Sequence, residues 1–514
     1  MKKMVAVFAA ALMLGAAGLA SAAGRQEAAS TPDGPMELTV LYTYDIPDDA
    51  PITRRIEEHF NVRLNTLNNA APNRAENIQV LQLLVASGDP IDAFIAYDHN
   101  MLRRFAQQGV IAEVPVELIR EEAPRMYAYV NQIDPNAWAF TNVDGRNYGF
   151  PTAWPLGDAS RVMSIRSDWL DNLGMDIPTT LDELEAVLYA FRNDDPNQSG
   201  TRDTYGMSFY QTPGNIQMFA PIYGAFGAHP QIFQVKDGEL VWGSILPETK
   251  EALTLLNKWY TDGIIDPSFF VDNINVFREK WYAGNFGLIP DTWWWTAGPS
   301  EMYFSGQFYD PLVQANPDAR PLTIPPPVGP RGDQGMRQRT VMEVIPMIVF
   351  GSHLENDDAK IRKWFNIWDE LLNTEEWSVF IYHGDEGITY RRRDDGFLEW
   401  IPPYDTFEKR AEYGMNYFPW VPNYDIYDTA TKDGDWIAQE RAKAIGPMDA
   451  ISGYPLRAWG EYKVALDTIE EQNFIRFITG ARPLSQWDQF VEEWMNAGGR
   501  QVLEEARQVY AQMQ

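Results

Sequence analysis

The 514-residue chain contains no cysteine and only five histidines. Without cysteine, disulfides, thiolate-bound zinc, iron–sulfur clusters and a thiol nucleophile are all excluded. No two histidines stand four residues apart, as they do on a zinc-binding helix, and the GxSxG, Walker A and GxGxxG signatures are missing. These absences favour a binding protein over the common enzyme classes.

Positive charge is also scarce, because 42 Lys+Arg stand against 72 Asp+Glu and leave a formal net charge of −30. Binding to a phosphate backbone depends on Lys and Arg displacing counterions, so nucleic acid is excluded as a partner. Hydrophobic residues make up 45% of the chain, which is typical of packed globular proteins. A single core rarely grows beyond about 300 residues, so we expect two large lobes.

The one long apolar run lies at the amino terminus, where Lys2 and Lys3 precede Val5 to Ala20. This run spans 16 residues, fewer than the roughly 20 that cross a bilayer as a helix, and Ala20-Ser21-Ala22 fits a signal-peptidase site. We predict a signal peptide over residues 1–22, a flexible segment over 23–35 and a periplasmic location. Because no cysteine follows the cleavage site, we expect no lipid anchor.

Strand-like and helix-like segments alternate along the remaining chain. Met36 to Tyr42 is rich in residues that favour strands, Thr53 to Phe60 has helical periodicity, and Val62 to Thr66 is extended again. Thr180 and Glu183 form the pattern of a capping box at a helix start. This alternation predicts α/β lobes with mostly parallel or mixed sheets.

Several short segments occur in an order that resembles a known family. They are LVASGDPIDAFIAYD (84–98), QQGVIAEV (107–114), VDGRNYGFPTAW (143–154), SIRSDWLDNLGMDIPTTLDEL (164–184), DPNQSGTRDTYG (195–206), LNKWYTDGIIDPSFF (256–270), PPPVGPRGDQG (325–335) and FITGARPLSQWDQFVEEWMNAGG (477–499). Together they resemble extracellular solute-binding protein family 1, the sugar-binding components of ABC importers. The long chain is most similar to the subgroup with alginate-binding and aldouronate-type oligosaccharide-binding proteins.

The resemblance implies a two-lobed periplasmic-binding-protein fold of type II, with hinge-crossing strands and a ligand cleft. It places the crossings near Phe150, Pro290 and Ile345. The first lobe would then comprise 36–152 plus 291–343, and the second 153–290 plus 344–514. It also implies a monomer without an organic cofactor, which captures an oligosaccharide and delivers it to the transmembrane subunits of an ABC permease by hinge closure.

Aromatic residues are the first candidates for ligand contact, since flat rings stack on the apolar faces of sugars and the chain has 18 Trp, 24 Tyr and 26 Phe. In an extended segment, Trp293 and Trp295 share one face and Trp294 takes the other. Core packing is the alternative for each ring, but three adjacent indoles cannot all face one core. We therefore predict that this run contacts the ligand.

Other candidates stand where strands end. Trp154 follows the first crossing, while Tyr42, Tyr44 and Asp98 lie at the carboxyl ends of predicted strands, where open α/β sheets bind ligands. Trp420, in an aromatic stretch, is a further candidate.

The segment GDEGITYRRRDDG (384–396) offers Glu386, Tyr390 and Arg391 in an EG-x-x-Y pattern that relatives carry. The three arginines Arg391 to Arg393 suit uronate carboxylates, which guanidinium binds bidentately. A solvated charge run neutralised by Asp394 and Asp395 is the alternative.

One loop matches the start of an EF-hand calcium loop, with oxygen-bearing residues at positions 1, 3, 5 and 9 and glycine at position 6. The predicted ligands of a structural calcium ion are Asp195, Asn197, Ser199, the Thr201 carbonyl and Asp203. Position 12 is Gly206 instead of glutamate, and position 10 is Thr204 where alginate-binding relatives carry a carboxylate. A plain Asx-rich turn therefore remains the alternative.

A second class of function stays open. A secreted glycoside hydrolase or polysaccharide lyase also uses carboxylates and tryptophans to handle sugars, and the composition does not exclude it. A peptide or lipid binder with the same fold is a third possibility.

Overall fold

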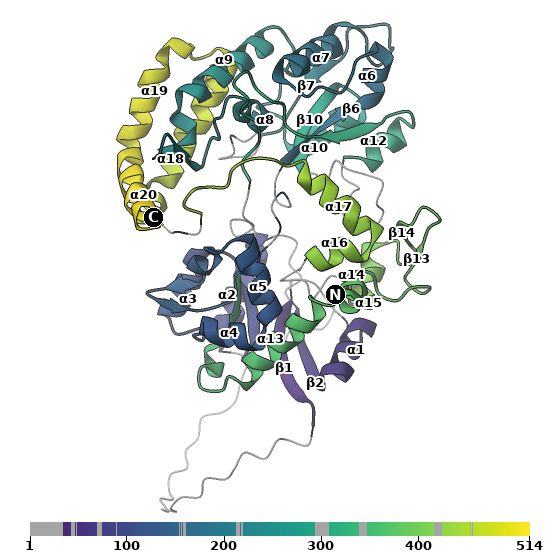
Figure 1. The fold of residues 1–514 in the computed structure, drawn as a ribbon, viewed down its shortest axis with the longest axis vertical. Helices are drawn as coiled ribbons and strands as arrows, with labels where there is room; N and C mark the ends of the chain where they lie inside the picture. Colours follow the sequence, from purple (N-terminus) through teal and green to yellow (C-terminus); the bar gives the residue numbers. More distant parts are fainter. Residues whose placement is uncertain are drawn as a thin grey trace, which may run out of the picture.

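The computed structural model describes residues 34–42, 47, 49–68, 74–88, 90–153, 155, 157, 161–211, 216, 219–292, 308–338, 347–415, 424–452, 454 and 456–513. These residues form two α/β lobes, which Figure 1 shows one above the other. The predicted signal peptide and residues 23–33 lie outside the described residues. No helix in the described part of the chain is both long and apolar enough to cross a membrane.

The first lobe is built on four strands in the spatial order β12 (Met347–Phe350), β3 (Ala93–Ala96), β1 (Met36–Tyr42) and β2 (Val62–Asn68). Strand β1 pairs in parallel with β2 along its whole length and in parallel with β3, whereas β12 pairs antiparallel to β3. The sheet is therefore mixed, which confirms the α/β prediction for this half.

Seven helices surround this sheet: α1 (Pro51–Phe60), α2 (Arg74–Ser87), α3 (His99–Gln107), α4 (Val116–Glu122), α5 (Pro124–Ile133), α13 (Ala359–Leu371) and α14 (Glu375–His383). Helix α1 shows why the local prediction succeeds. Pro51 at its first position has the backbone angle a helix start needs, and Asn61 ends it in a left-handed conformation. Its apolar face, Ile52, Ile56 and Phe60, is buried in the core.

Smaller elements complete the first lobe. They are the hairpin of β4 (Asn142–Val143) and β5 (Arg146–Asn147), the hairpin of β13 (Tyr390–Arg392) and β14 (Leu398–Trp400), and helix α15 (Phe407–Tyr413).

The second lobe has a four-stranded sheet in the order β11 (Pro321–Ile324), β6 (Arg161–Arg166), β10 (Phe286–Thr292) and β7 (Tyr205–Met207), and a separate hairpin of β8 (Phe233–Lys236) and β9 (Glu239–Trp242). Its helices are α6 (Ser167–Leu173), α7 (Leu181–Asn193), α8 (Ala220–Gly224), α9 (Pro247–Thr261), α10 (Ile274–Tyr282), α12 (Asp310–Ala315), α18 (Arg457–Thr479), α19 (Trp487–Trp494) and α20 (Arg500–Met513). The predicted capping box is present, because Thr180 and Glu183 each accept the other's backbone N–H.

The division of the chain between the lobes differs from the predicted one. We expected 291–343 in the first lobe, but β11 pairs with β6, and Phe308, Leu312 and Ala319 pack in the second core. We expected 344–514 in the second lobe, but β12 pairs with β3, and α13 and α14 pack in the first core. The chain therefore returns to the first lobe between β11 and β12 and not near Pro290. The prediction failed because the sequence of a short apolar strand does not indicate which sheet the strand joins.

Helices α16 (Tyr424–Ala430) and α17 (Lys432–Ala442) make a further connection between the lobes (Figure 1). Helix α16 packs against α14 of the first lobe. At the other end of the pair, Glu440 of α17 accepts a hydrogen bond from Thr323 of β11 in the second lobe. The two helices approach closely because Gly434 has no side chain: a Cβ there would lie 2.2 Å from the Tyr427 carbonyl oxygen. Helices α16 and α17 therefore contact both lobes.

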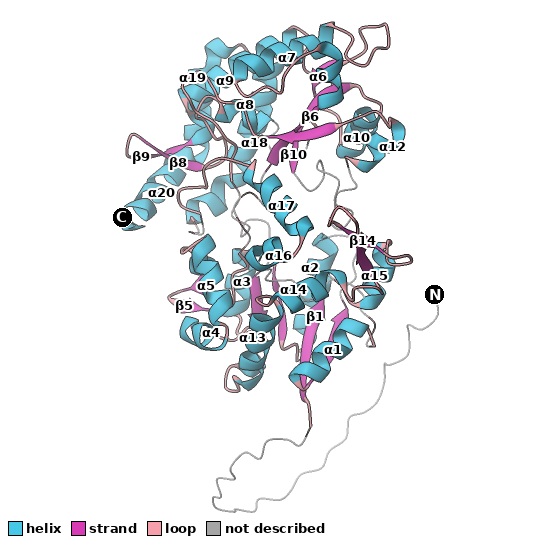
Figure 2. Cartoon of the chain, turned by 45° about the vertical axis from the view of Figure 1, so that its right-hand side comes forward, coloured by secondary structure: helices cyan, strands magenta, loops and turns pink. Residues whose placement is uncertain are grey.

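Both sheets direct the same end toward the opposite lobe. In the second lobe, β6 begins at Arg161 directly opposite Thr292, the last residue of β10. In the first lobe, β12 begins at Met347 directly opposite Ala96, the last residue of β3. Since β6 and β12 each start where the chain arrives from the other lobe, the carboxyl ends of β3 and β10 face the interlobe region. Figure 2 shows one sheet in each lobe, with β1 in the first and β6 and β10 in the second.

A carboxyl group lies fully buried in the second core. Glu470 of α18 has no exposed surface and accepts hydrogen bonds from the Trp242 indole N–H (2.7 Å) and the Ser244 hydroxyl (2.8 Å). Burial raises the pKa of Glu470 to about 7, although these hydrogen bonds oppose the shift. The folded protein therefore holds a proton here more tightly than the unfolded chain does.

This difference predicts how stability depends on pH. The raised pKa favours folding below pH 4.5, and that contribution is lost as the pH rises to about 7. Replacement of Glu470 by Gln keeps the acceptor for Trp242 and removes the charge. We expect the E470Q variant to match the wild type near pH 4.5 and to exceed its free energy of unfolding at pH 8 by up to about 3 kcal/mol. Urea unfolding across this range measures the difference.

The exposed Glu504→Gln variant is the control, and it should show no such trend. A difference between E470Q and wild type that stays constant with pH would contradict the prediction.

Candidate functional site

The interlobe end of the second sheet carries a cluster of aromatic and polar side chains. Phe209 and Tyr210 follow strand β7, and their rings stack at 5.0 Å with an angle of 3° between the planes. The guanidinium carbon of Arg161 lies 4.9 Å from the centre of the Phe209 ring. Because Arg161 begins β6 and faces Thr292, this cluster lies where the chain passes between the lobes.

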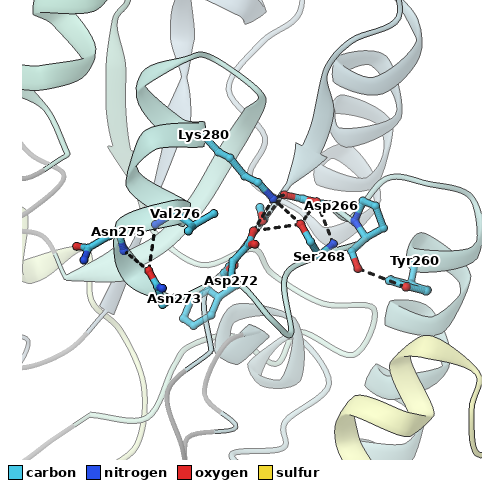
Figure 3. A network of polar contacts seen from close by, with 11 residues as sticks. Tyr260, Asp266, Ser268, Asp272, Asn273, Asn275, Val276 and Lys280 are labelled. Atoms are coloured by element: carbon cyan, nitrogen blue, oxygen red, sulfur yellow. Dashed lines mark hydrogen bonds and ion pairs between the residues drawn. The ribbon is translucent and has the colours of Figure 1, made fainter.

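A polar network holds the loop that lies beside this cluster (Figure 3). The Lys280 ammonium donates to Asp266 (2.8 Å), to Asp272 and to the Ser268 hydroxyl. Both carboxylates are almost fully buried, with 3% of Asp266 and 7% of Asp272 exposed. Burial alone would lower the pKa of Lys280, but the two carboxylates outweigh it and raise that pKa above its usual value.

The same loop is joined to the end of β7. The Asp272 carbonyl oxygen accepts a hydrogen bond from the Gln211 backbone N–H at 2.8 Å, and the Ser208 hydroxyl donates to Asp266 at 3.3 Å. The side-chain NH2 group of Gln211 donates to Glu471 of α18. The side-chain oxygen of Gln211, Oε1, has no hydrogen-bond partner among the described residues. Lys280 therefore binds the two aspartates to which Ser208 and Gln211 are hydrogen-bonded.

Asp98, one of the predicted ligand contacts, stands at the carboxyl end of β3. Its side chain accepts a hydrogen bond from the Met101 backbone N–H at 2.8 Å and caps α3, and the residue is exposed. The neighbouring His99 bonds to the Phe140 carbonyl oxygen at 2.8 Å, and burial lowers the pKa of His99. Asp98 thus combines a structural task with a position at the interlobe end of the first sheet.

The predicted residues Glu386, Tyr390 and Arg391 lie in and before the β13–β14 hairpin. Tyr390 is only 4% exposed and packs against His383, so burial raises the pKa of its hydroxyl. Glu386 is exposed and lies 3.5 Å from the guanidinium of Arg392. These contacts give Tyr390 a packing role and show that Glu386 has a cationic partner within its own hairpin.

The three arginines of the hairpin all have carboxylate partners. Arg391 pairs with Glu399 across the two strands, Arg392 with Glu386, and Arg393 with Asp395. Their exposure makes each pair weak, but together the partners neutralise the charge that the sequence offered to a uronate.

Below the hairpin, His383 is 2% exposed and its Nε2 lies 2.9 Å from the Tyr427 hydroxyl of α16. Burial, with help from Arg392 and Arg410, lowers the pKa of His383 to about 3. This histidine is therefore neutral at physiological pH and joins α14 to the helix pair that connects the lobes.

Six predicted ligand residues lie outside the described residues, and Tyr42 is the last residue of β1. They are Tyr44, Trp154, Trp293, Trp294, Trp295 and Trp420. Contact between these residues and a ligand stays a prediction.

The predicted calcium loop gathers its oxygen atoms around Ser199. The Ser199 hydroxyl lies 3.1 Å from Asp203 Oδ1, 3.2 Å from the Thr201 carbonyl oxygen and 3.4 Å from Asp195 Oδ1. The Asn197 amide donates to the same oxygen of Asp203 at 3.1 Å. Burial alone would raise the pKa of Asp203, but these hydrogen bonds outweigh burial and lower that pKa. Hydrogen bonds through Ser199 and Asp203 thus link the five predicted ligands to one another.

This donor set has only two carboxylates. In the described part of the chain, no three His, Cys, Asp or Glu side chains gather where they could hold a metal ion. An oxygen-lined loop of this composition suits a hard cation such as calcium and does not suit zinc.

Sequence inspection missed Arg161, Asp272 and Lys280. The segment DGIIDPSFF (262–270) carried a usable signal, because Asp266 and Ser268 flank a proline in the pattern of a tight turn. Nothing local marks Arg161 or Lys280, since their partners lie on other elements.

Comparison with known proteins gives a family and a set of similar structures. Residues 57–351 match the family model described as bacterial extracellular solute-binding protein. Lipoprotein LipO of Bacillus subtilis (strain 168) is 25% identical over 524 residues, which cover 99% of this chain and 98% of LipO.

The similar solved structures include two sugar-binding proteins. The Streptococcus pneumoniae ABC-transporter substrate-binding protein FusA, in complex with kestose, matches with a TM-score of 0.66 and 20% identity over 93% of this chain and 99% of that chain. Alginate-binding protein AlgQ2 without calcium ion matches with a TM-score of 0.61 and 19% identity over 93% and 98%. A FusA EF-hand mutant in complex with fructo-nystose has a TM-score of 0.65, with 20% identity over 93% and 99%. At these identities the likeness shows the fold.

The Lys280 network generates a stability prediction. Replacement of Lys280 by Met leaves Asp266 and Asp272 buried without a cation, which should cost on the order of 3 kcal/mol. The Lys258→Met variant is the matched control, because Lys258 pairs with Glu185 at an exposed position and should cost less than about 1 kcal/mol. Denaturant unfolding of both variants measures the contrast.

Adding Asp272→Asn to the Lys280→Met variant should recover part of the loss, since one unpaired carboxylate is then removed. Equal costs for the two lysines would show that the network does not hold the loop.

Proposed function

Because the chain belongs to the bacterial extracellular solute-binding protein family, we propose that it captures an oligosaccharide between its two lobes and delivers it to an ABC permease. The main structural support is that the carboxyl ends of both sheets face the opposite lobe, which is where open α/β sheets bind ligands. Hinge closure of two such lobes encloses a solute and presents a new surface to a membrane partner.

Sugar is the proposed solute on two grounds. Two proteins with similar structures, FusA and AlgQ2, have kestose and alginate named as their ligands. At the interlobe end of the second lobe, the partly exposed Arg161 lies against the buried ring of Phe209, which stacks on Tyr210. The guanidinium of Arg161 can donate hydrogen bonds to the hydroxyl groups of a sugar.

The proposed ligand contacts combine these groups with the predicted ones. Trp154, Trp293 and Trp295 would stack on the sugar, and Asp98 would approach it from the first lobe. The relatives named for a role are binding proteins, so we propose that the sugar leaves chemically unchanged and that the protein is not an enzyme. We also propose export through the signal peptide to the periplasm, and action as a monomer.

Titration and product analysis together test the function. We expect the exported protein to bind at least one member of a panel of neutral and acidic plant and algal oligosaccharides with micromolar affinity, which corresponds to about −8 kcal/mol. Calorimetric titration measures the binding, and mass spectrometry of the recovered sugar should show the input mass. New reducing ends or unsaturated products would instead identify a glycoside hydrolase or lyase, and stabilisation by peptides alone would exclude a sugar.

We further propose that the loop from Asp195 to Asp203 binds calcium as a structural ion. The contacts of Asp195, Asn197, Thr201 and Asp203 with Ser199 support this, as do the mention of calcium for AlgQ2 and of an EF-hand for FusA. The missing carboxylate at position 12 makes the site weak.

This proposal predicts a calcium-dependent stability. For a dissociation constant of about 0.1 to 1 mM, about 10 mM calcium should stabilise chelator-treated protein by about 1.4 to 2.7 kcal/mol. The Asp203→Asn variant should lose this gain, whereas Asp318→Asn, at an exposed position outside the loop, should keep it. Thermal unfolding with and without calcium measures the effect, and magnesium at the same concentration controls for ionic strength. An unchanged wild-type transition would mean a plain Asx-rich turn.

A further inference from the structure

Arg161 occupies a position that brings its charge to the interlobe end of the second lobe. It is the first residue of β6 and lies opposite Thr292, the last residue of β10. Its side chain is partly exposed. Any group bound between the lobes at this end of the sheet would therefore meet a guanidinium.

The guanidinium has few interactions of its own. Its carbon lies 4.9 Å from the centre of the Phe209 ring, and one nitrogen lies 3.4 Å from the Pro290 carbonyl oxygen, a long hydrogen bond. Among the described residues, no carboxylate lies within ion-pairing distance of it. A guanidinium carries five N–H donors, so most of its bonding capacity is available to a ligand.

Other cations at this end of the molecule differ in this respect. Arg391, Arg392 and Arg393 each pair with a carboxylate of their own hairpin, and Lys280 serves two carboxylates at once. In a chain with a net charge of −30, carboxylates are abundant. Arg161 differs in that it pairs with no carboxylate among the described residues.

The Phe209 ring restricts the orientation of the Arg161 guanidinium. Phe209 is fully buried and stacks on Tyr210, so the surface against which the guanidinium lies is held in place. A guanidinium fixed against an aromatic ring keeps its donor edge available for a planar partner, and it matches the two oxygens of a carboxylate.

We propose that Arg161 binds the carboxylate of an acidic sugar residue, so that the captured oligosaccharide contains uronic acid. This inference rests on the proposed function and names the chemistry of its solute. Arg161 of the second lobe is the residue that binds the carboxylate. The arginines of the β13–β14 hairpin already pair with carboxylates of the protein and are not needed for this binding.

Matched pairs of sugars test the proposal. The probes are trigalacturonate, trimannuronate and an aldotetraouronate, each beside its carboxyl-reduced counterpart, which has the same linkages and no charge. We expect the wild type to bind at least one acidic probe at least tenfold more tightly than its reduced counterpart. Calorimetric titration at 50 and 200 mM salt should show the affinity for the acidic probe falling with salt and that for the reduced one unchanged.

Substitution of Arg161 then assigns the effect. The R161Q variant should lose at least tenfold in affinity for the acidic probe and change less than twofold for the reduced one, and R161K should fall between R161Q and wild type. Arg331→Gln is the matched control, because Arg331 also lies near a phenylalanine ring, that of Phe226, but pairs with Glu251. It should bind like the wild type, and thermal unfolding should show that all variants are folded.

Three outcomes overturn the inference. If the wild type binds neutral oligosaccharides but none of the acidic probes, the proposed function stands and the role of Arg161 falls. If R161Q weakens the acidic and reduced forms equally, Arg161 contacts hydroxyl groups or shapes the site. If no saccharide binds, the proposed function itself fails. The wild-type comparison of acidic and reduced probes decides the matter even if R161Q does not fold.

Discussion

Two backbone pairings determine which strand ends face the region between the lobes. They are Arg161 opposite Thr292 and Met347 opposite Ala96. In each pair one strand begins and its neighbour ends where the chain travels from one lobe to the other. Because hydrogen bonding fixes the register of a sheet, the loops after β3 and β10 must open toward the facing lobe. Asp98, just after β3, and Arg161, opposite the last residue of β10, therefore lie at the ends of their sheets that face the other lobe.

Local structure was largely predictable, since its causes are local. The strands Met36–Tyr42 and Val62–Asn68, helix α1 and the capping box at Thr180 follow from periodicity and end signals that act over a few residues. Assignment of strands to lobes was not predictable. Strands β11 and β12 are both short and apolar, and the choice of sheet depends on which partner edge the folded chain leaves open.

The chemistry of the site was predictable only in part, for an electrostatic reason. A sequence shows charges but not their partners. The run Arg391 to Arg393 was prominent in the sequence, yet strand pairing brings Glu399 to Arg391 and a turn brings Glu386 to Arg392. Arg161 was inconspicuous because the feature that distinguishes it, a cation without a carboxylate partner in the described part of the chain, exists only in three dimensions. The predicted calcium loop could be recognised as a candidate because its five residues are nearly contiguous.

The packing of the β8–β9 hairpin has a consequence for biosynthesis. Trp242 and Phe233 share a core with Trp494 and with Val502 of α20, which follow the hairpin by more than 200 residues. A nascent polypeptide leaves the ribosome amino end first, so the hairpin emerges long before the helix that covers it. The core that the hairpin shares with α20 therefore cannot close until α20 has left the ribosome, and until then the hairpin stays in a form that chaperones can engage.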